Sequence, residues 1–517
     1  MLRSMIGRAR SLVGRDPLLA ATFALLWCFA LIPIWWPRFL PLLDLPDHLA
    51  AIAVWNRYHD PSWHYDKFYN LNLLPVPYWG YFFPVHLLSY VMPIEVANKV
   101  YLSAYALALP VGVALVGKRM GRSPWLAVFA FPLVFNFNFS LGFVTFCGGL
   151  AVLFYAIYAL DSFLEKPARG SAIAVGLLSL LLYFMHILPW MFFGLSAIVL
   201  LFSHGWHPRR MAVAAGVMLP SLLIALYGFH AASGATAVRG GPLKFDARFD
   251  TALVNLQQLP TSILTATGGD MAYRIMLGLC ALWLILLLTA RTDGRDSAAG
   301  EHGFAYRLEL IAGLAAIMPF ILPVHMFKPV DLWMIGGRFV SVAALFAVLL
   351  PHGALEGRRK LLLVPAIALA LYYPQQLGKA WHRFDQRASS VRRLLATVPR
   401  GSSTLTLIIG DGTDPDVEKQ TVPYLQFHAY AHLYAGGFDP WSLSTGFPMI
   451  ARPDAALPAP VWKHPETFHL EVQGVHYDYL LTKGETWDYS MFGPNDAGLA
   501  PLIDQDGDWR LYRIRHP

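Results

Sequence analysis

The chain has 517 residues, of which 56% are apolar and only 14% are charged. A soluble domain carries roughly 25% charged residues, so this composition excludes an ordinary soluble protein and indicates a membrane protein. The formal net charge of +7 gives no nucleic-acid signal, because the basic residues occur in short clusters between apolar segments, as cytoplasmic loops do. The three cysteines lie within apolar segments and imply no disulfide framework.

The first apolar segment, Pro17 to Trp36, follows an N-terminal stretch that contains several arginines. It is long for the core of a signal peptide, and no small-residue cleavage site follows it. We interpret it as a retained first transmembrane helix with a cytoplasmic N-terminus.

The motif DLPDH (44–48) lies just after this segment, in a long loop of about residues 37–95. Pro46 suits the first turn of a helix, so we predict a surface helix from Asp47 to about Tyr58. Two carboxylates and an imidazole are thereby gathered at one membrane interface. An acid–base site for a lipid-anchored substrate would lie there.

Each of these three residues also has a simpler interpretation. Asp44 can serve only as the helix N-cap, Asp47 is favoured in a first turn by the helix dipole, and His48 can be a packing residue. The Asp44-x-x-Asp47 spacing can hold a divalent cation such as Mg²⁺ or Mn²⁺, but the spacing alone is a weak signal.

The segment Tyr78–Pro93 decides the topology. It is apolar but short, and it contains Pro84 and His86, whereas a spanning helix needs about 20 residues. If it spans the membrane, the later basic clusters lie outside; if it is a re-entrant or surface helix, they are cytoplasmic. The positive-inside rule favours the second topology. The clusters are Lys118, Arg119, Arg122, Arg209, Arg210, Arg358, Arg359 and Lys360.

This topology predicts a mostly α-helical, polytopic membrane bundle of about eleven spans, with the C-terminal part outside. The run 171–202 is too long for one helix and is expected to break at His186. The expected spans are 17–36, 96–116, 124–139, 142–162, 171–185, 187–203, 211–229, 272–290, 308–325, 338–353 and 359–374.

After about Tyr373 the composition changes, which predicts two domains: a membrane domain, 1–374, and an extracytoplasmic mixed α/β domain, 375–517. A helical pattern covers 381–398, and three strands are expected. The aromatic- and His-rich segment YLQFHAYAHLY (424–434) can bind a partner or lean over the membrane site. The expected strands are Thr404–Ile409, Tyr477–Leu481 and Trp509–Ile514.

The polar residues of the membrane domain concentrate at the outer ends of helices and in outer loops. Ionisable residues near membrane depth are costly and are functional candidates by default, so we predict a site at the outer face. Its candidate residues are Asp44, Asp47, His48, His86, Asn136, Asn138, His186, His325, Lys328, Asp331 and Arg338.

Several of these candidates have two interpretations. His186 lies at a helix break beside Pro189, where it can satisfy freed backbone groups or contact substrate. Arg338 can snorkel to the interface, or its planar fork can bind a phosphate, and Lys328 is a weaker version of the same case. His86 and His325 fit packing or interfacial positions. No P-loop, dinucleotide fingerprint, nucleophile elbow or Cys-x-x-Cys motif supports a nucleotide-using reaction.

The pattern resembles the GT-C superfamily of polytopic membrane glycosyltransferases. The resemblance is carried by the acidic motif DLPDH (44–48) after the first span and by the aromatic- and Pro-rich PVPYWGYFFPVHLL (75–88) before the second. Many short-looped spans and an extracytoplasmic α/β domain ending in a strand such as WRLYRI (509–514) complete it. Many members carry adjacent acids, or acids one residue apart, whereas Leu45-Pro46 intervene here.

The resemblance implies inverting transfer of a sugar from a polyprenyl-phosphate donor to a lipid, glycan or protein acceptor, on the periplasmic face of a bacterial inner membrane. By position, Asp44 would be the general base, and Asp47 and His48 would position the acceptor or a metal. Arg338 and Lys328 would stabilise the departing phosphate, and His186 would lie at the pocket rim. The remaining candidates for substrate binding are Asn138, His325 and Asp331.

Two other classes of function remain open at this point. A transporter or flippase of lipid-linked glycans would place ionisable residues at the midplane and show inverted repeats, and neither is evident in the sequence. A non-catalytic scaffold for envelope assembly would use the C-terminal domain as its docking surface.

Overall fold

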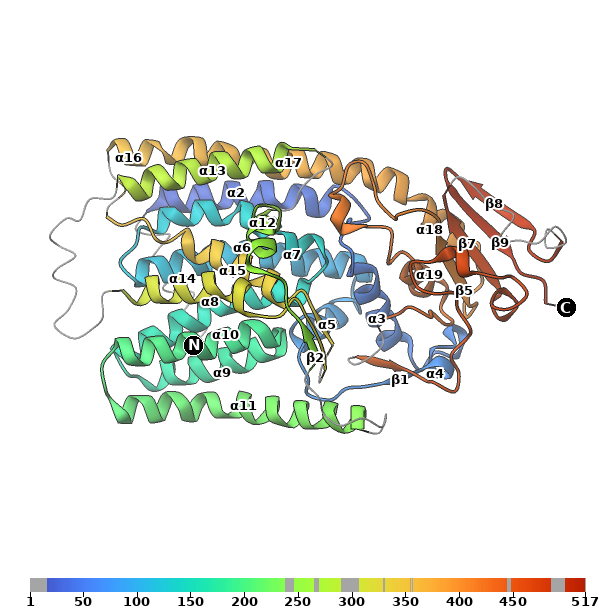
Figure 1. Cartoon of the computed structure of the whole chain (residues 1–517), viewed down its shortest axis with the longest axis horizontal. Coiled ribbons are helices and arrows are strands. Elements are labelled where there is room, and N and C mark those ends of the chain that lie inside the picture. Colours follow the sequence, from blue (N-terminus) through green and yellow to red (C-terminus); the bar gives the residue numbers. More distant parts are fainter. Residues whose placement is uncertain are drawn as a thin grey trace.

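The computed structural model describes residues 16–237, 246–264, 269–289, 306–328, 331–353, 355, 357–443, 448–484 and 498–516. Long helices lie side by side in one bundle, and a smaller domain with the C-terminal strands extends beyond one end of it (Figure 1). We call this end the domain end and the other the opposite end.

The bundle is that of a multi-pass membrane protein. In the described part of the chain, six helical segments are long and apolar enough to cross a membrane. Five of them are α2 (Pro17–Trp35), α6 (Ile94–Arg119), α8 (Val144–Glu165), α11 (Pro208–Ala237) and α13 (Met271–Leu288). The sixth, Arg358–Leu395, comprises α16 (Arg358–Leu361), α17 (Leu363–Ala388) and α18 (Ser390–Leu395).

Shorter helices complete the bundle. The expected break at His186 is confirmed, because α9 ends and α10 begins on either side of it. Of the spanning segments, α8 is the most enclosed, with 83% of its apolar window buried against 17% for α11, so α8 lies at the centre and α11 at the lipid-facing rim. The shorter helices are α9 (Arg169–Met185), α10 (Ile187–Ser203), α12 (Ala252–Ile263), α14 (Arg307–Ile321) and α15 (Ile335–Ala347).

The segment 124–139, expected as a single span, is not one continuous α-helix. The segment consists of two 3₁₀ helices, η2 (Pro124–Ala130) and η3 (Pro132–Phe135), and the single turn α7 (Phe137–Ser140). Pro132 has no backbone N–H to continue a helical hydrogen-bond ladder, and Asn136 has an extended backbone that ends η3 and caps α7. All of its residues after Pro124 are buried, so its apolar composition reflects the core of the bundle.

The first loop folds against the domain end. The predicted surface helix is α3 (Leu45–Arg57), and the segment that decided the topology contains the ten-residue α5 (Trp79–Leu88). Ten residues rise about 15 Å, half the thickness of a bilayer core, so α5 alone is too short to span. Between them lie η1 (Pro61–Trp63), α4 (Tyr65–Phe68) and β1 (Tyr69–Leu71).

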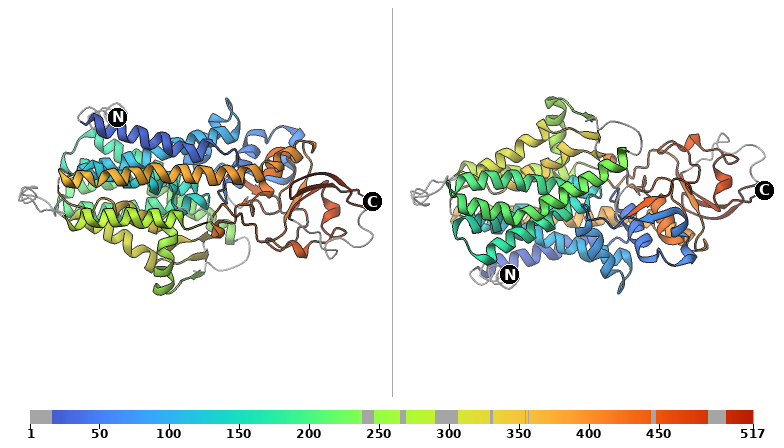
Figure 2. Two further views of the ribbon diagram at one scale, coloured as in Figure 1. Left: turned by 90° about the horizontal axis from the view of Figure 1, so that it is seen from above. Right: turned by 90° about the horizontal axis from the view of Figure 1, so that it is seen from below.

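Helix α17 passes through the expected domain boundary without interruption. It continues past residue 374 and ends at Ala388, so the bundle and the C-terminal domain share one helix (Figure 2). The change in composition near Tyr373 therefore marks where this helix emerges from the apolar part of the bundle.

The C-terminal domain contains a four-stranded sheet with the order β5-β7-β9-β8. The three predicted strands are present, with β5 and β7 parallel and β7 and β9 antiparallel. The fourth strand, β8, was not predicted; it pairs with β9 through a turn at Gly507, whose φ is +58°. The strands are β5 (Thr404–Ile408), β7 (Tyr479–Lys483), β8 (Leu502–Asp506) and β9 (Trp509–Arg513).

One small sheet and one helix join the first loop to the C-terminal domain, and a second small sheet is formed by loops of the bundle. Strand β1 of the first loop pairs antiparallel with β6 (Met449–Ala451) of the C-terminal domain. Helix α19 (His428–Ala435) packs against both α3 and β5. The small sheet β2-β3-β4 is formed by β2 (Asp246–Arg248), β3 (His325–Lys328) and β4 (Leu332–Trp333).

The opposite end of the bundle is held by ion pairs around a fully buried carboxylate. Asp161 pairs with Arg119 at 2.6 Å, His204 at 2.9 Å and Arg307 at 3.1 Å, which joins the ends of four helical segments. The basic clusters assigned to cytoplasmic loops terminate α6 and open α11 and α16 at this end (Figure 1).

Candidate functional site

The DLPDH motif is held in place by the backbone of the turn that follows α7. The amides of Leu43 and Asp44 donate to the carbonyls of Ser140 and Leu141, each at 3.1 Å. Gly142 has a φ of +78°, and a Cβ atom there would lie 2.6 Å from the amide nitrogen of Asp44. This approach requires glycine for its conformation and for the space beside the motif.

Asp44 occupies the N-cap position of α3, but its carboxylate makes no capping hydrogen bond. Burial raises the pKa of Asp44 to about 7, against the opposing effects of Arg338, a hydrogen bond from Gln426, and Lys463. Among the described residues, no cation forms an ion pair with Asp44 within 4.0 Å. Capping therefore does not account for this side chain, and its pKa allows both protonation states near neutral pH.

Asp47, in the first turn of α3, is buried with one oxygen unused. Its Oδ1 accepts a hydrogen bond from the Leu443 amide at 3.2 Å, whereas its Oδ2 is buried without a hydrogen-bond partner. Burial raises the pKa of Asp47, and the nearby carboxylates of Asp439 and Asp44 add to this effect against the attraction of His428. A buried oxygen without a partner is costly, so it marks a place for a ligand or a proton.

A row of polar side chains from the C-terminal domain covers the motif. His428, at the start of α19, has Nδ1 2.7 Å from Asp439 Oδ2 and Nε2 2.7 Å from Gln426 Oε1. Gln426 in turn bonds to Asp44, so a buried chain of hydrogen bonds runs from Asp44 to Asp439. Burial alone would lower the pKa of His428, but the charge and hydrogen bond of Asp439 raise it above its usual value.

His48 lies on the other side of α3, in an aromatic environment. Its ring packs against those of Tyr81 and Phe82, with centroids 5.6 and 5.4 Å away. Burial lowers the pKa of His48 to about 4, opposed by a hydrogen bond with the Gly142 backbone. The imidazole is therefore neutral near pH 7 and fastens α3 to α5 and to the turn after α7.

Arg338 lies in the first turn of α15 and is also buried. Its Nη2 donates to the carbonyl of Trp333 at 2.9 Å, and its guanidinium carbon lies 3.8 Å from the centre of the Phe143 ring. Its Nε is buried without a hydrogen-bond partner. Packing thus fixes the plane of the guanidinium while one of its donors stays free for an anion.

His186 and Arg338 each direct a hydrogen-bond donor at the other. Its Nδ1 accepts from the Leu188 amide at 3.1 Å, and its Nε2 lies 3.0 Å from Arg338 Nη1. A neutral imidazole that accepts at Nδ1 carries its proton on Nε2, so this N–H faces an N–H of the guanidinium. An anionic oxygen placed beside both groups would resolve this conflict by accepting from each.

Asn138 holds the backbone of the helix that carries Arg338. Its amide nitrogen donates to the Ser341 hydroxyl at 2.8 Å and to the Arg338 carbonyl at 3.4 Å, while its Oδ1 is buried without a hydrogen-bond partner. Asn136 caps α7 through the Phe139 amide. Of the two asparagines, Asn138 holds α15 and Asn136 shapes the turn that carries the motif.

The other candidates lie apart from this cluster. His325 and Asp331 pair with each other at 2.6 Å on the small β2-β3-β4 sheet, where Asp331 is exposed. His86 stacks on Trp55 with centroids 4.0 Å apart and hydrogen-bonds to Asn56, so it is a packing residue of α5. The side chain of Lys328 lies outside the described residues.

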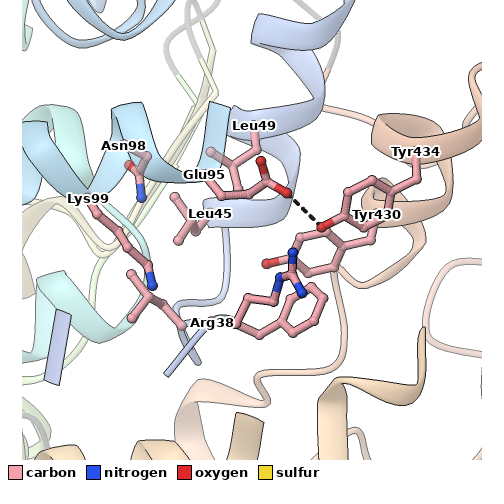
Figure 3. A pocket seen from close by; sticks show the side chains of 10 residues that line it. Arg38, Leu45, Leu49, Glu95, Asn98, Lys99, Tyr430 and Tyr434 are labelled. Atoms are coloured by element: carbon pink, nitrogen blue, oxygen red, sulfur yellow. Dashed lines mark hydrogen bonds between the residues drawn. The ribbon is translucent and has the colours of Figure 1, made fainter. Parts of the chain in front are cut away.

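The C-terminal domain is anchored beside the motif by α19. Tyr434 donates to Glu95 at the start of α6 at 2.8 Å, and the two joined side chains form part of the lining of a narrow cavity (Figure 3). The cavity has a volume of 10 Å³, about that of one water probe, so it is no substrate pocket. Its lining includes Leu45 and Leu49 of α3, which shows how closely α19 covers this helix.

Gln426, His428 and Asp439 were not predicted as site residues. The segment 424–434 was expected either to bind a partner or to lean over the membrane site, and α19 packs on α3. Nearly 400 residues separate Asp47 from its partner Leu443, and no local pattern links such positions. Tyr78 was also missed: its φ of +86° is strained for a non-glycine residue, and its ring packs 5.5 Å from that of His186.

No protein-family model matches the chain, and no curated protein matches it in sequence. Among solved structures, it is similar to ArnT from Cupriavidus metallidurans bound to undecaprenyl phosphate, with a TM-score of 0.52 and 12% identity. The match to ArnT in the apo state has a TM-score of 0.51 and 10% identity, and each covers 97% of this chain and 98% of ArnT. The expected resemblance is thus confirmed at the level of architecture: the chain has a GT-C-like fold over almost its whole length.

Proposed function

We propose that the protein is a membrane glycosyltransferase that uses a polyprenyl-phosphate-linked sugar as donor, with Asp44 as general base and Arg338 as the phosphate-binding residue. The observation that carries the proposal is the presence, in one site, of a half-buried carboxylate with a raised pKa and no ion-pair partner and of a buried guanidinium with an unused donor. The structural likeness to ArnT, which was solved with undecaprenyl phosphate bound, supports the choice of donor.

In this reaction the carboxylate of Asp44 removes the proton from an acceptor hydroxyl as its oxygen attacks the anomeric carbon of the sugar. The bond between that carbon and the phosphate oxygen breaks, and the lipid phosphate leaves with the electron pair. Arg338 and the Nε2–H of His186 stabilise the negative charge that develops on the phosphate. Removing one such donor in other enzymes costs about 10²–10³ in rate.

Arg338 is buried and Asp44 is half-buried, which supports this assignment. Apolar surroundings exclude water and strengthen the electrostatic interactions of the site, and a base with a pKa of about 7 is well matched to proton transfer near neutral pH. We further propose that the domain end faces the periplasm of a bacterial inner membrane, because the basic clusters terminate helices at the opposite end.

The test uses the full chain in proteoliposomes supplied with radiolabelled polyprenyl-phosphate sugars and an extract of envelope acceptors. Asp44→Asn should lower transfer by roughly 10²–10⁴-fold, and Arg338→Ala should lower it by a comparable factor. Asp454→Asn, at an exposed acid paired with Arg452 in the C-terminal domain, is the matched control and should retain wild-type transfer. Wild-type transfer by the Asp44→Asn protein would contradict the proposal.

A further inference from the structure

Three buried side chains from two parts of the molecule converge near Asp47. The oxygen and nitrogen atoms that Asp47, His428 and Asp439 offer as ligands all lie within 4.8 Å of one another. Asp47 comes from the first turn of α3, His428 from the start of α19, and Asp439 from the loop that follows α19. Each is at most 3% exposed, which rules out an accidental cluster of solvated surface acids.

A second observation points to a missing ligand at this place. Asp47 Oδ2 is buried without a hydrogen-bond partner, although the carboxylate is nine-tenths buried or more. One helical turn beyond His428, His432 is also buried, and neither of its ring nitrogens makes a hydrogen bond of normal geometry. Buried polar atoms in folded proteins are nearly always satisfied, so a bound ion would account for these unused acceptors.

The environment of His428 is that of a metal ligand. Its Nε2 lies 2.7 Å from Gln426 Oε1 and can donate to that oxygen, which leaves Nδ1 directed at Asp439. Imidazoles that bind metals typically donate their second N–H to a carbonyl or carboxylate, which fixes the ring and its tautomer. Gln426 would perform this role and would connect the metal site to Asp44.

We propose that Asp47, His428 and Asp439 form a zinc site that joins the first loop to the C-terminal domain. An imidazole nitrogen with two carboxylate oxygens suits Zn²⁺ better than Mg²⁺, which takes oxygen ligands. Neighbouring ligand atoms around tetrahedral zinc lie roughly 3.3 Å apart, so His428 and Asp439 separate slightly from their present 2.7 Å, and Asp47 draws nearer. The fourth position is taken by water or by His432.

A bound ion would also affect the position of Asp44. The ion would fix the first turn of α3 against α19, and thereby set the position of Asp44, which lies three residues before Asp47 and bonds to Gln426. The zinc site does not depend on the proposed transfer reaction, because it is defined by metal binding and by the stability of the domain contact.

The experiment is metal analysis of the full chain purified in detergent without chelators, followed by removal of metal and titration with Zn²⁺, Mn²⁺ or Mg²⁺. We expect one zinc ion per chain by mass spectrometry, and a higher midpoint of thermal unfolding with Zn²⁺ than with Mg²⁺. His428→Gln and Asp439→Asn should lose the zinc and the thermal shift. His464→Gln is the matched control, since His464 is an exposed histidine paired with Glu466 in the same domain.

X-ray absorption at the zinc edge of the wild-type protein gives a readout that does not depend on how the variants fold. At least one imidazole and additional oxygen ligands at roughly 2.0–2.2 Å are expected. Wild-type protein that neither retains zinc nor is stabilised by it, or equal zinc content in the wild type, His428→Gln and Asp439→Asn, would overturn the site.

Discussion

The two ends of the bundle differ in whether their enclosed carboxylates have ion-pair partners. At the opposite end, Asp161 is surrounded by Arg119, Arg307 and the imidazole of His204 at 2.6–3.1 Å. At the domain end, Asp47 is equally buried and Asp44 is half-buried. Neither carboxylate forms an ion pair within 4.0 Å among the described residues. A carboxylate whose charge is fully compensated holds helices together, whereas one that lacks compensation remains available for chemistry or for a ligand.

The comparison predicts opposite effects on stability for the same chemical change. Asp161→Asn leaves Arg119, His204 and Arg307 without their common partner and should cost about 3–5 kcal/mol, as for other broken buried pairs. Asp44→Asn should instead stabilise the protein. The measurement is thermal unfolding of both variants in detergent at pH 8, and destabilisation of equal size in both would contradict the comparison.

The stabilisation by Asp44→Asn should depend on pH. The pKa of Asp44 is raised to about 7 in the folded state from 3.8 in the unfolded state. The contribution of Asp44 to stability is therefore greatest below pH 3.8 and is lost as the pH rises from 3.8 to about 7. The advantage of the variant therefore grows between these values and is constant above them. At its maximum it is on the order of a few kcal/mol.

Arginine-to-lysine substitutions at the two ends of the bundle should differ in their effect on the transfer rate. Arg338→Lys keeps the charge but removes the planar fork, and we expect transfer to fall roughly 10–100-fold. Arg119→Lys, at the opposite end, should leave transfer per folded molecule unchanged while it lowers the thermal midpoint. Rates normalised to folded protein separate the two effects, and equal transfer by both variants would remove Arg338 from the site.

The rate of transfer should report the ionisation of Asp44. The general base acts as a carboxylate, so the rate should rise about tenfold per pH unit below pH 7 and level off above it. The charged groups that act on Asp44 are Arg338 of α15, Asp47 of α3 and Lys463 of the C-terminal domain. Lys463→Met should shift the inflection to higher pH, because Lys463 lowers the pKa of Asp44.

Two glycines provide the finest test. Gly142 and Gly121 have nearly the same φ, +78° and +76°, but a Cβ atom at Gly142 would meet the backbone of Asp44, whereas one at Gly121 meets nothing within 4 Å. In both alanine variants the left-handed backbone conformation should lower the stability of the fold by roughly 1–2 kcal/mol. Only Gly142→Ala should also lower transfer, by several-fold, because the motif must move. Similar activities in the two variants would show that the position of the motif is not critical.

Much of the fold could be predicted, because apolar length, proline position and strand alternation act locally. Helices α2, α6, α9, α10 and α3 fall within a few residues of their expected ranges. The helix expected over 124–139 is interrupted, because apolar composition indicates burial and does not distinguish a continuous α-helix from buried 3₁₀ turns. Strand β8 was missed because LIDQD has only two apolar residues and lies at the sheet edge.

Only part of the candidate site could likewise be predicted from the sequence. Asp44, Asp47 and Arg338 were identified because charged residues near apolar segments stand out in the sequence. Gln426 and Asp439 could not be identified, since ordinary polar residues in a soluble domain gain meaning only from the fold that places them over α3. The assignment of His325 and Asp331 to the site rested on topology alone and stays a prediction, because depth in the membrane does not specify which side of the bundle a residue faces.

Helix α17 gives the molecule a mechanical property. Its 26 residues make a rod about 39 Å long that begins among the spanning helices and ends within the C-terminal domain. The domain therefore cannot swing freely on a tether, and any movement must tilt this rod or bend it at Pro374, where one helical hydrogen bond is missing. A truncation that starts at residue 375 would cut the rod in two and expose apolar surface that the bundle normally covers.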